Sequence, residues 1–193
     1  MGRIKSALEI ALERTESVKS DKAGIDQFEA KQKGKKLANA FLAGGADLGD
    51  EIKKSPADQQ KSLKQGIFDV LISQVSLPAA KEDEKRIEAA GKGLAIIIND
   101  SRFTAMYKQL TGVLSQYLQE AAQYEQAIRQ QYAPRLRQKE EELSRRMGRE
   151  VRIDPFQDPE FTAFFNQHIN ALKGNYEAAL NQVKDEARRL FNN

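Results

Sequence analysis

The chain has 193 residues and no cysteine, which excludes disulfides, thiolate zinc sites and cysteine nucleophiles. Its 31 basic and 28 acidic side chains give a net charge of only +3, so the overall charge does not by itself indicate a nucleic-acid-binding protein. Hydrophobic residues make up 40% of the chain and can build a core, but no apolar run approaches the ~20 residues of a membrane span.

The N-terminus lacks the apolar core of a secretory signal, because Glu9 and Glu13 interrupt the only candidate stretch. We therefore expect a cytoplasmic protein. Residues 1–6 (MGRIKS) fit the short N-myristoylation pattern, and a membrane-surface protein that uses the first amphipathic helix is one alternative. An ordinary amphipathic helix start explains the same residues more simply, because the pattern is permissive.

Residues 1–100 predict an N-terminal helical segment, a small bundle of about four shorter helices. Apolar residues recur there at helical spacing, and the helices are separated by Gly44-Gly45 and by two prolines, Pro56 and Pro78. The expected helices cover approximately residues 4–18, 25–43, 56–77 and 81–98. The sequence thus predicts an all-α protein in which this segment packs against the base of a longer element.

That longer element is a long antiparallel helical hairpin, coiled-coil-like, over residues 101–193. In the second arm the apolar stripe repeats every eleven residues, as in Phe161, Leu172 and Val183, which keeps it nearly straight along a helix. Pro134 predicts a kink near residues 130–134. In the first arm the apolar residues step alternately by three and four, like the a and d positions of a coiled coil: Tyr107, Leu110, Leu114, Tyr117, Ala121, Tyr124 and Ile128.

The turn of the hairpin is predicted near residues 148–158. Gly148 is placed to end the first arm, because glycine readily adopts the left-handed conformation found after helices. Asp158 can cap the second arm, Pro159 suits its first position and Glu160 complements the positive end of the helix dipole.

Seven basic residues crowd the distal end of the hairpin and form a candidate polar contact patch. They are interspersed with four acids, Glu140, Glu141, Glu142 and Glu150, and lie beside apolar and aromatic residues such as Phe156. Such a surface can grip a protein partner, or hold phosphates and stack bases. The patch consists of Arg135, Arg137, Lys139, Arg145, Arg146, Arg149 and Arg152.

No catalytic, cofactor-binding or metal-binding constellation is found in the sequence. His168 is the single histidine and has no ligand-spaced partner, so we interpret it as a residue at the edge of the apolar stripe. Gly91-Lys92-Gly93 fails the phosphate-loop pattern, and its glycines more plausibly let another helix approach closely. The acids Asp47, Asp50 and Glu51 lack the spacing of a calcium loop, and we interpret residues 44–50 as a solubilising loop.

Three pieces of the sequence carry a resemblance to a known family. They are IKSALE (4–9) with ERT (13–15), GKKLANAFL (34–42), and MGREVRID (147–154) with PEF (159–161) and YE (176–177). With these pieces the chain resembles a family of small bacterial proteins described only as a domain of unknown function. The resemblance implies a bacterial, intracellular, helical protein and assigns it no site.

From the residues we expect a non-enzymatic protein–protein interaction or assembly module without a cofactor. Self-association, with a homodimer favoured, is expected because the hairpin stripe exceeds what one kinked arm can cover. The partner protein is not specified by the sequence. The alternatives are an RNA- or ribosome-associated factor that binds through the basic tip, and an enzyme that works with carboxylates, Lys, Tyr or His168.

Overall fold

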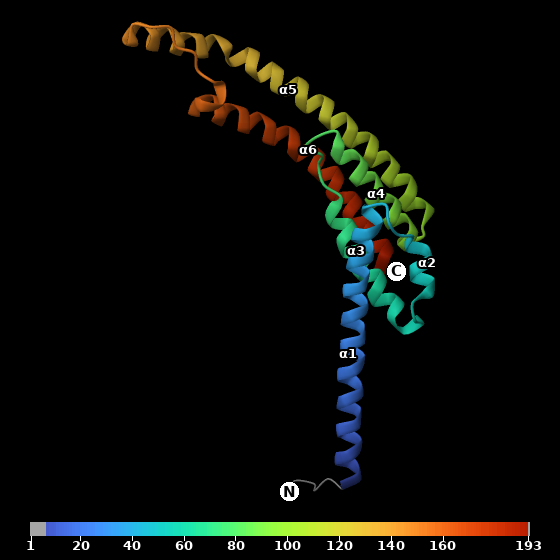
Figure 1. Cartoon of the computed structure of the whole chain (residues 1–193). Helices are drawn as coiled ribbons and strands as arrows, with labels where there is room; N and C mark the ends of the chain where they lie inside the picture. The colour runs from blue at the N-terminus through green and yellow to red at the C-terminus, as the bar shows by residue number, and fades with distance from the viewer. Residues whose placement is uncertain (1–6, 193) are drawn as a thin grey trace. The chain divides into compact units, whose positions relative to one another are not determined.

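The computed structural model describes the backbone of residues 7–192 and the side chains of residues 24–192. Over this range the chain is all-α, which confirms the predicted fold class. No helix in it is both long and apolar enough to cross a bilayer. The myristoylation pattern of residues 1–6 and the apolar face predicted for residues 4–18 lie outside the described residues and side chains. The helices are α1 (Ala7–Leu42), α2 (Leu48–Lys54), α3 (Ala57–Gln74), α4 (Glu82–Ile98), α5 (Ser101–Met147), the short 3-10 helix η1 (Pro155–Gln157) and α6 (Pro159–Asn192) (Figure 1).

The first two predicted helices are one continuous helix, α1, so that prediction was wrong. No proline interrupts residues 7–42, and a single glycine such as Gly24 costs a helix only about 1 kcal/mol. The predicted loop 44–50 is also partly wrong, because α2 begins within it at Leu48. Asp47 caps this helix by accepting a hydrogen bond from the Asp50 backbone N–H at 3.0 Å, and Asp50 and Glu51 lie in its first turn.

The chain packs as two compact units, residues 1–75 with 89–101, and residues 76–88 with 102–193. The domain boundary that we placed between residues 100 and 101 stays a prediction. In the first unit, α1 and α3 run antiparallel, since Gly34 lies against residues 63–67 and Lys31 forms an ion pair with Asp69 at 2.8 Å. A Cβ built on Gly34 would lie 2.1 Å from the Leu63 carbonyl oxygen, so the two helix backbones touch there.

Gly66 of α3 makes a similar close backbone contact with α1. A Cβ on Gly66 would lie 2.0 Å from the carbonyl oxygen of Lys31. The predicted close approach at the second glycine of Gly91-Lys92-Gly93 is confirmed, because a Cβ on Gly93 would lie 2.6 Å from Leu71 and 2.9 Å from Phe41. The core of this unit therefore depends on glycines that let helices and bulky side chains come unusually close.

The second unit is built on α5 and α6, which lie side by side and antiparallel (Figure 1). Aromatic pairs set their register: the rings of Tyr117 and Tyr176 are 5.0 Å apart, and those of Tyr132 and Phe161 are 5.3 Å apart. α5 continues without a break through Pro134. At the other end, the Tyr107 hydroxyl donates a hydrogen bond to the Ile87 carbonyl oxygen at 2.7 Å, which ties the start of α4 to α5.

The buried residues of this hairpin form two groups. One lies at its base and the other near its turn, where Ile128, Tyr132 and Phe161 form a small core. No described residue is buried between Tyr117 and Ile128 on α5, or between Phe161 and Leu180 on α6. The base group contains Phe103, Tyr107, Leu110, Leu114, Tyr117, Leu180, Val183, Ala187 and Leu190.

Candidate functional site at the hairpin tip

The end of α5 extends beyond α6. Tyr132 faces Phe161, so in an antiparallel pair Pro159, the first residue of α6, lies opposite Pro134. Residues 135–147 of α5, here called the overhang, therefore have no α6 residue opposite them and extend ~20 Å at 1.5 Å per residue (Figure 1). Gly148 ends α5 in the left-handed conformation with φ of +65°, as predicted, and residues 148–158, the return segment, run back to α6.

The return segment is hydrogen-bonded to the overhang in a matched register. The backbone N–H of Val151 donates to Ser144 Oγ at 2.9 Å, and that of Ile153 donates to Glu140 Oε1 at 2.9 Å. Two residues of extended chain span about 6.6 Å, while four residues of helix span about 6.0 Å, so these donors and acceptors fall opposite one another. These two N–H groups, two residues apart in the extended chain, thus meet side chains that lie one helical turn apart on α5.

Asp158 is the centre of a polar network where the return segment enters α6. Its side chain is only 4% exposed, and Lys139 Nζ donates to both of its carboxylate oxygens at 3.0 and 2.8 Å. The Tyr132 hydroxyl donates to the same carboxylate at 3.1 Å, and the Glu160 backbone N–H does so at 3.0 Å, which confirms the predicted cap. Lys139 Nζ also lies 2.9 Å from Glu160.

This network lowers the pKa of Asp158 and raises the pKa values of Lys139 and Tyr132. Burial acts to raise the pKa of Asp158, but the hydrogen bonds from Lys139, the Glu160 N–H and Tyr132 outweigh it and the pKa is lowered. The hydrogen bonds to Asp158 and Glu160 raise the pKa of Lys139. Burial, followed by the hydrogen bond to Asp158, raises the pKa of Tyr132. The ion pair of Lys139 and Asp158 is therefore favoured at neutral pH.

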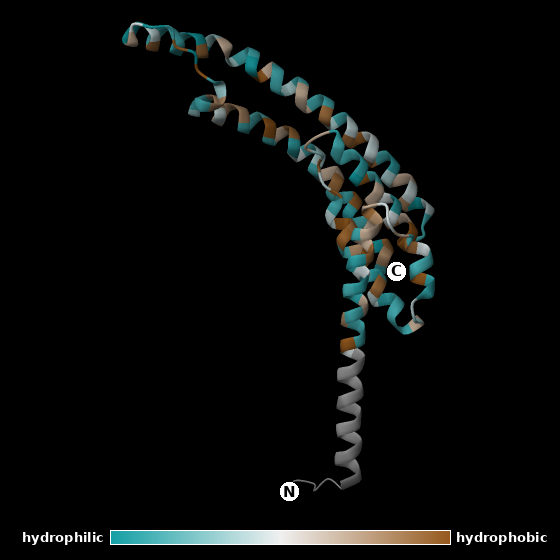
Figure 2. Ribbon diagram, viewed as in Figure 1, coloured by the Kyte–Doolittle hydropathy of each residue, from teal (hydrophilic) through white to brown (hydrophobic). Residues whose placement is uncertain are grey.

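Aromatic side chains close the tip on its other side. The ring of Phe156 in η1 makes edge contacts with Phe161 and Phe165 at centroid distances of 5.3 and 5.2 Å. The guanidinium of Arg129 lies 4.8 Å from the centre of the Phe156 ring. Phe156 nevertheless remains 44% exposed, so the tip presents one aromatic ring to solvent. Figure 2 shows the resulting mixture of hydrophilic and hydrophobic residues along the end of α5 and the return segment.

The seven cations of the predicted patch do not act as one group. Lys139 belongs to the internal network, and the guanidinium of Arg135 lies 6.0 Å from the Tyr132 ring centre. Three arginines form exposed ion pairs, Arg145 with Glu141, Arg146 with Glu142 and Arg152 with Glu150. Among the described residues, Arg137 and Arg149 have no ion-pair partner. The patch is therefore a mixed-charge surface rather than a continuous basic one.

An open groove of about 480 Å³ lies between the overhang and the return segment. Three arginines and three glutamates line it, so it has no single sign of charge. Beside the groove, Leu143 and Met147 are 37% and 53% exposed. The groove is lined by Arg137, Glu140, Glu141, Ser144, Arg145, Glu150, Val151 and Arg152.

His168 lies away from these groups, in the middle of the hairpin. Its ring packs against Phe164 at 4.4 Å and against Tyr124 at 6.4 Å. No set of three or more potential metal-binding His, Cys, Asp or Glu side chains occurs among residues 24–192. The observed ring contacts are those of a packing residue at the edge of the apolar stripe.

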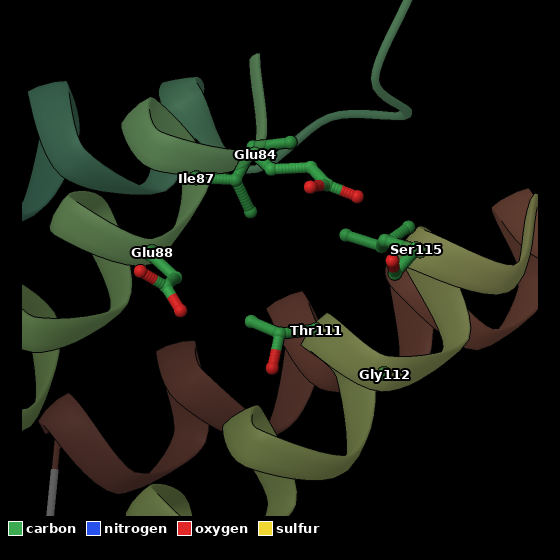
Figure 3. Close-up of a pocket in the computed structure, with 7 residues that line it drawn as sticks. Glu84, Ile87, Glu88, Thr111, Gly112 and Ser115 are labelled. Atoms are coloured by element: carbon green, nitrogen blue, oxygen red, sulfur yellow. The ribbon is translucent and has the colours of Figure 1, made fainter. Parts of the chain in front are cut away.

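A second pocket, of about 240 Å³, lies where the start of α4 meets α5 (Figure 3). The carboxylates of Glu84 and Glu88 come from α4, and the hydroxyls of Thr111 and Ser115 come from α5. The Thr111 hydroxyl already donates to the Lys108 carbonyl oxygen at 2.8 Å. A Cβ on Gly112 would meet nothing within 4 Å, so the missing side chain of this glycine helps to leave the space open.

The sequence located the tip but not its internal contacts. Lys139 was grouped with the surface cations, and the roles of Ser144 and Glu140 were missed, because each depends on the path that the return segment takes along α5. One signal was present in the sequence. A capping aspartate followed by proline fixes where α6 begins, and hence which residues of α5 remain uncovered.

The fold and the tip define the class of protein: an all-α protein with a long helical hairpin whose longer arm ends in an overhang. Residues 49–189 match the family of unknown function DUF6657, and the chain belongs to this family. This confirms the predicted relationship to a domain of unknown function. The match includes the tip, but it begins after the two N-terminal pieces that carried part of the resemblance. Searches of the curated proteins and of the solved structures gave no match.

Proposed function

We propose that the protein is a non-enzymatic interaction module that binds a protein partner through the hairpin tip. The observation that carries this proposal is the exposure of Leu143 and Met147, 37% and 53%, on a part of α5 that α6 does not reach. They lie four residues apart and therefore on one face of the helix. Large apolar side chains that stand together on a helix inside a polar surround are typical of protein interfaces.

The tip is also ordered in advance of binding. The return segment is fixed to the overhang by the hydrogen bonds of Val151 and Ile153 and by the ion pair of Lys139 with Asp158. A surface whose backbone is already fixed loses less conformational entropy when a partner binds. These contacts therefore support a preformed docking surface.

The polar groups of the tip support a binding role more than a catalytic one. Asp158, Lys139, Tyr132, Glu140 and Ser144 are all engaged in hydrogen bonds that hold the chain in place. A catalytic acid, base or nucleophile must be able to reach the reacting group of a bound substrate. We therefore propose that these residues are structural and that no reaction takes place at the tip.

Protein is favoured over nucleic acid as the partner because the tip carries both signs of charge. Binding to a phosphate backbone depends on cations that are free to replace counterions. Of the seven cations only Arg137 and Arg149 lack an ion-pair or ring contact among the described residues. RNA binding through these two arginines and the exposed ring of Phe156 remains the competing outcome of the test below.

The experiment is site-specific photo-crosslinking in cells that normally make the protein. A photoreactive phenylalanine analogue replaces Met147, and in the matched control it replaces Gln138, which is exposed on the same helix. The proposal predicts a discrete protein adduct from position 147 that is weak or absent from position 138 and insensitive to nuclease. Adducts that disappear with nuclease, or no adduct at position 147, would contradict it.

A further inference from the structure

We propose that the pocket between α4 and α5 binds a small aliphatic diamine. This inference does not depend on the function of the hairpin tip. The residues that line the pocket all belong to the second unit, so the pocket lies within one compact part of the chain (Figure 3). None of the seven described lining residues is basic, although the chain as a whole has a net charge of +3. The pocket is therefore acidic against the overall charge of the protein.

The polar groups of the pocket form two similar pairs. In Figure 3, Glu84 of α4 lies across the pocket from Ser115 of α5, and Glu88 lies across from Thr111. Each pair combines a carboxylate with a hydroxyl, and the pairs are one helical turn apart, which places their Cβ atoms about 5–6 Å apart. The two nitrogens of an extended four-carbon diamine are about 6 Å apart. One ammonium group can therefore reach each pair.

These side chains are suited to accept hydrogen bonds from ammonium. The Thr111 hydroxyl already donates to the Lys108 carbonyl oxygen at 2.8 Å, so toward a ligand it can only accept. An ionised carboxylate also only accepts. The side chains of Glu84 and Ser115 have no hydrogen bond or ion pair with another described residue, so both are available to a ligand. A ligand that carries donors and positive charge fits this set better than an anion.

The other lining residues leave room for an aliphatic chain. Ile87 and Leu114 are each 2% exposed and supply apolar walls that methylene groups can contact. A Cβ on Gly112 would meet nothing within 4 Å, although a glycine inside a helix costs about 1 kcal/mol relative to alanine. No packing contact among the described residues therefore requires glycine at this position. A ligand that occupies the space beside it would explain the glycine.

The size of the pocket and its ligand set favour a small organic cation over a metal ion. The volume of about 240 Å³ is below the ~300–1,000 Å³ of sites for drug-sized ligands. Calcium and magnesium ions take about six or more oxygen ligands in compact geometry. The pocket offers two carboxylates, and no group of three or more potential His, Cys, Asp or Glu ligands occurs among residues 24–192.

Binding should be weak, because the carboxylates are not deeply buried. Glu84 is half-buried and Glu88 is exposed, so water and salt screen their attraction for a cation. We therefore expect a dissociation constant on the order of a millimolar at low salt.

The test is an NMR titration of the purified full chain with diaminobutane, which carries one amine at each end. It should shift the amide signals of Gly112 and Ser115 in a saturable way. Aminobutane should bind at least about tenfold more weakly, because it leaves one carboxylate–hydroxyl pair without a cation. Butanediol has the same length and no charge, and it should not bind. Magnesium chloride alone should give no saturable shift at these amides.

Two variants test the charge. Glu84→Gln keeps the size of the side chain and removes one of the two negative charges, so it should weaken diaminobutane binding at least about tenfold. The matched control is Glu82→Gln, the same change at an exposed position of α4 that does not line the pocket. It should leave binding nearly unchanged.

Two further variants test the space. Gly112→Leu should fill the pocket and abolish binding, yet leave the fold at least as stable to urea, because leucine favours a helix more than glycine does. The matched control is Gly174→Leu on α6, where a Cβ also meets nothing within 4 Å. It should be as stable as Gly112→Leu and bind diaminobutane like the wild type. A loss of binding without a loss of stability separates a ligand site from a structural role.

The proposal is overturned if diaminobutane gives no saturable shift at concentrations about tenfold above the expected dissociation constant. Equal binding of aminobutane or butanediol, or saturable binding of magnesium at the same amides, would also overturn it. The same holds for equal losses in Glu84→Gln and Glu82→Gln, and for undiminished binding in Gly112→Leu. None of these residues lies in the tip, so such results would leave the proposed function of the tip unaffected.

Discussion

At the scale of single residues, Asp158 combines two roles that are usually separate. It caps α6 through the Glu160 N–H, and it holds the return segment to α5 through Lys139. Asparagine caps helices about as well as aspartate but carries no charge. The substitution Asp158→Asn therefore removes the ion pair and keeps the cap, whereas Asp158→Ala removes both and should cost a further ~1 kcal/mol.

We predict that the difference in free energy of unfolding between the wild type and Asp158→Asn depends on pH. The folded-state pKa of Asp158 is lowered, so its contribution is present above the unfolded-state pKa of about 3.9 and is lost as pH falls through the folded-state value. Lys139 has a raised pKa, so its contribution is complete below about 10.4. Urea unfolding should show a constant difference from about pH 5 to 9 that shrinks below about pH 4.

The shrinking of the stability difference below about pH 4 is due to Asp158 if the variant Asp154→Asn does not show the same pH dependence. Asp154 lies in the same return segment and caps η1 by accepting from the Phe156 N–H at 3.0 Å, but it is exposed. A difference between the wild type and Asp158→Asn that stays constant down to pH 2 would show that the ion pair does not stabilise the tip.

At the scale of elements, the pairing of α1 with α3 depends on two glycines. We predict that Gly34→Ala destabilises the protein by at least about 1–3 kcal/mol, because its Cβ would lie 2.1 Å from a backbone oxygen that cannot rotate away. Gly112→Ala is the matched control, since its Cβ meets nothing within 4 Å on α5 and it should gain up to ~1 kcal/mol in helix propensity. Urea unfolding of the two variants measures both effects, and equal effects of the same sign would contradict this account.

The return segment is fixed to α5 by two hydrogen bonds that can be removed one at a time. Ser144→Ala removes the acceptor of the Val151 N–H and should speed hydrogen exchange at that amide several-fold, with little effect at Ile153. Glu140→Ala should do the reverse, because Glu140 accepts from the Ile153 N–H. NMR-detected exchange resolves the two amides. If either variant speeds both equally, the segment is released as a whole rather than fixed at two points.

These elements also show which features the sequence could predict. The ends of the hairpin arms at Gly148 and Pro159 follow from local backbone chemistry, so the sequence located them correctly. The contact of Gly34 with α3 was not predicted, because it depends on two helices that are distant in the chain and carries no local signal. α1 was divided wrongly because a weakly amphipathic stretch near Gly24 resembles a boundary, although nothing there ends a helix.

The same distinction applies to the tip. The basic patch was predicted from composition, and the structure divides it into one internal lysine, three paired arginines and three others. The expected self-association was argued from an apolar stripe too long for one arm to cover. The ends of that stripe, including Tyr107, Leu114 and Val183, are buried within the chain, whereas its middle, between Phe161 and Leu180 on α6, is only partly buried.

At the scale of the whole hairpin, two buried groups are separated by a stretch that lacks buried residues. The middle is joined instead by half-exposed contacts, such as the Tyr176 hydroxyl, which donates to Glu120 at 2.6 Å. This hydrogen bond raises the pKa of Tyr176 to about 12. Little apolar surface is buried between the two groups, so the opening of one should couple weakly to the opening of the other.

We therefore predict that the tip and the base of the hairpin open independently. Phe161→Ala removes a fully buried ring from the tip core, a change that typically costs about 3–5 kcal/mol. It should speed hydrogen exchange around residues 128–136 and 159–165 and leave residues 103–117 and 180–190 nearly unchanged. Leu180→Ala is the reciprocal variant and should give the opposite pattern, because Leu180 belongs to the base group. Exchange measured by mass spectrometry resolves these segments, and equal loss of protection throughout the hairpin in either variant would mean that it opens as one cooperative unit.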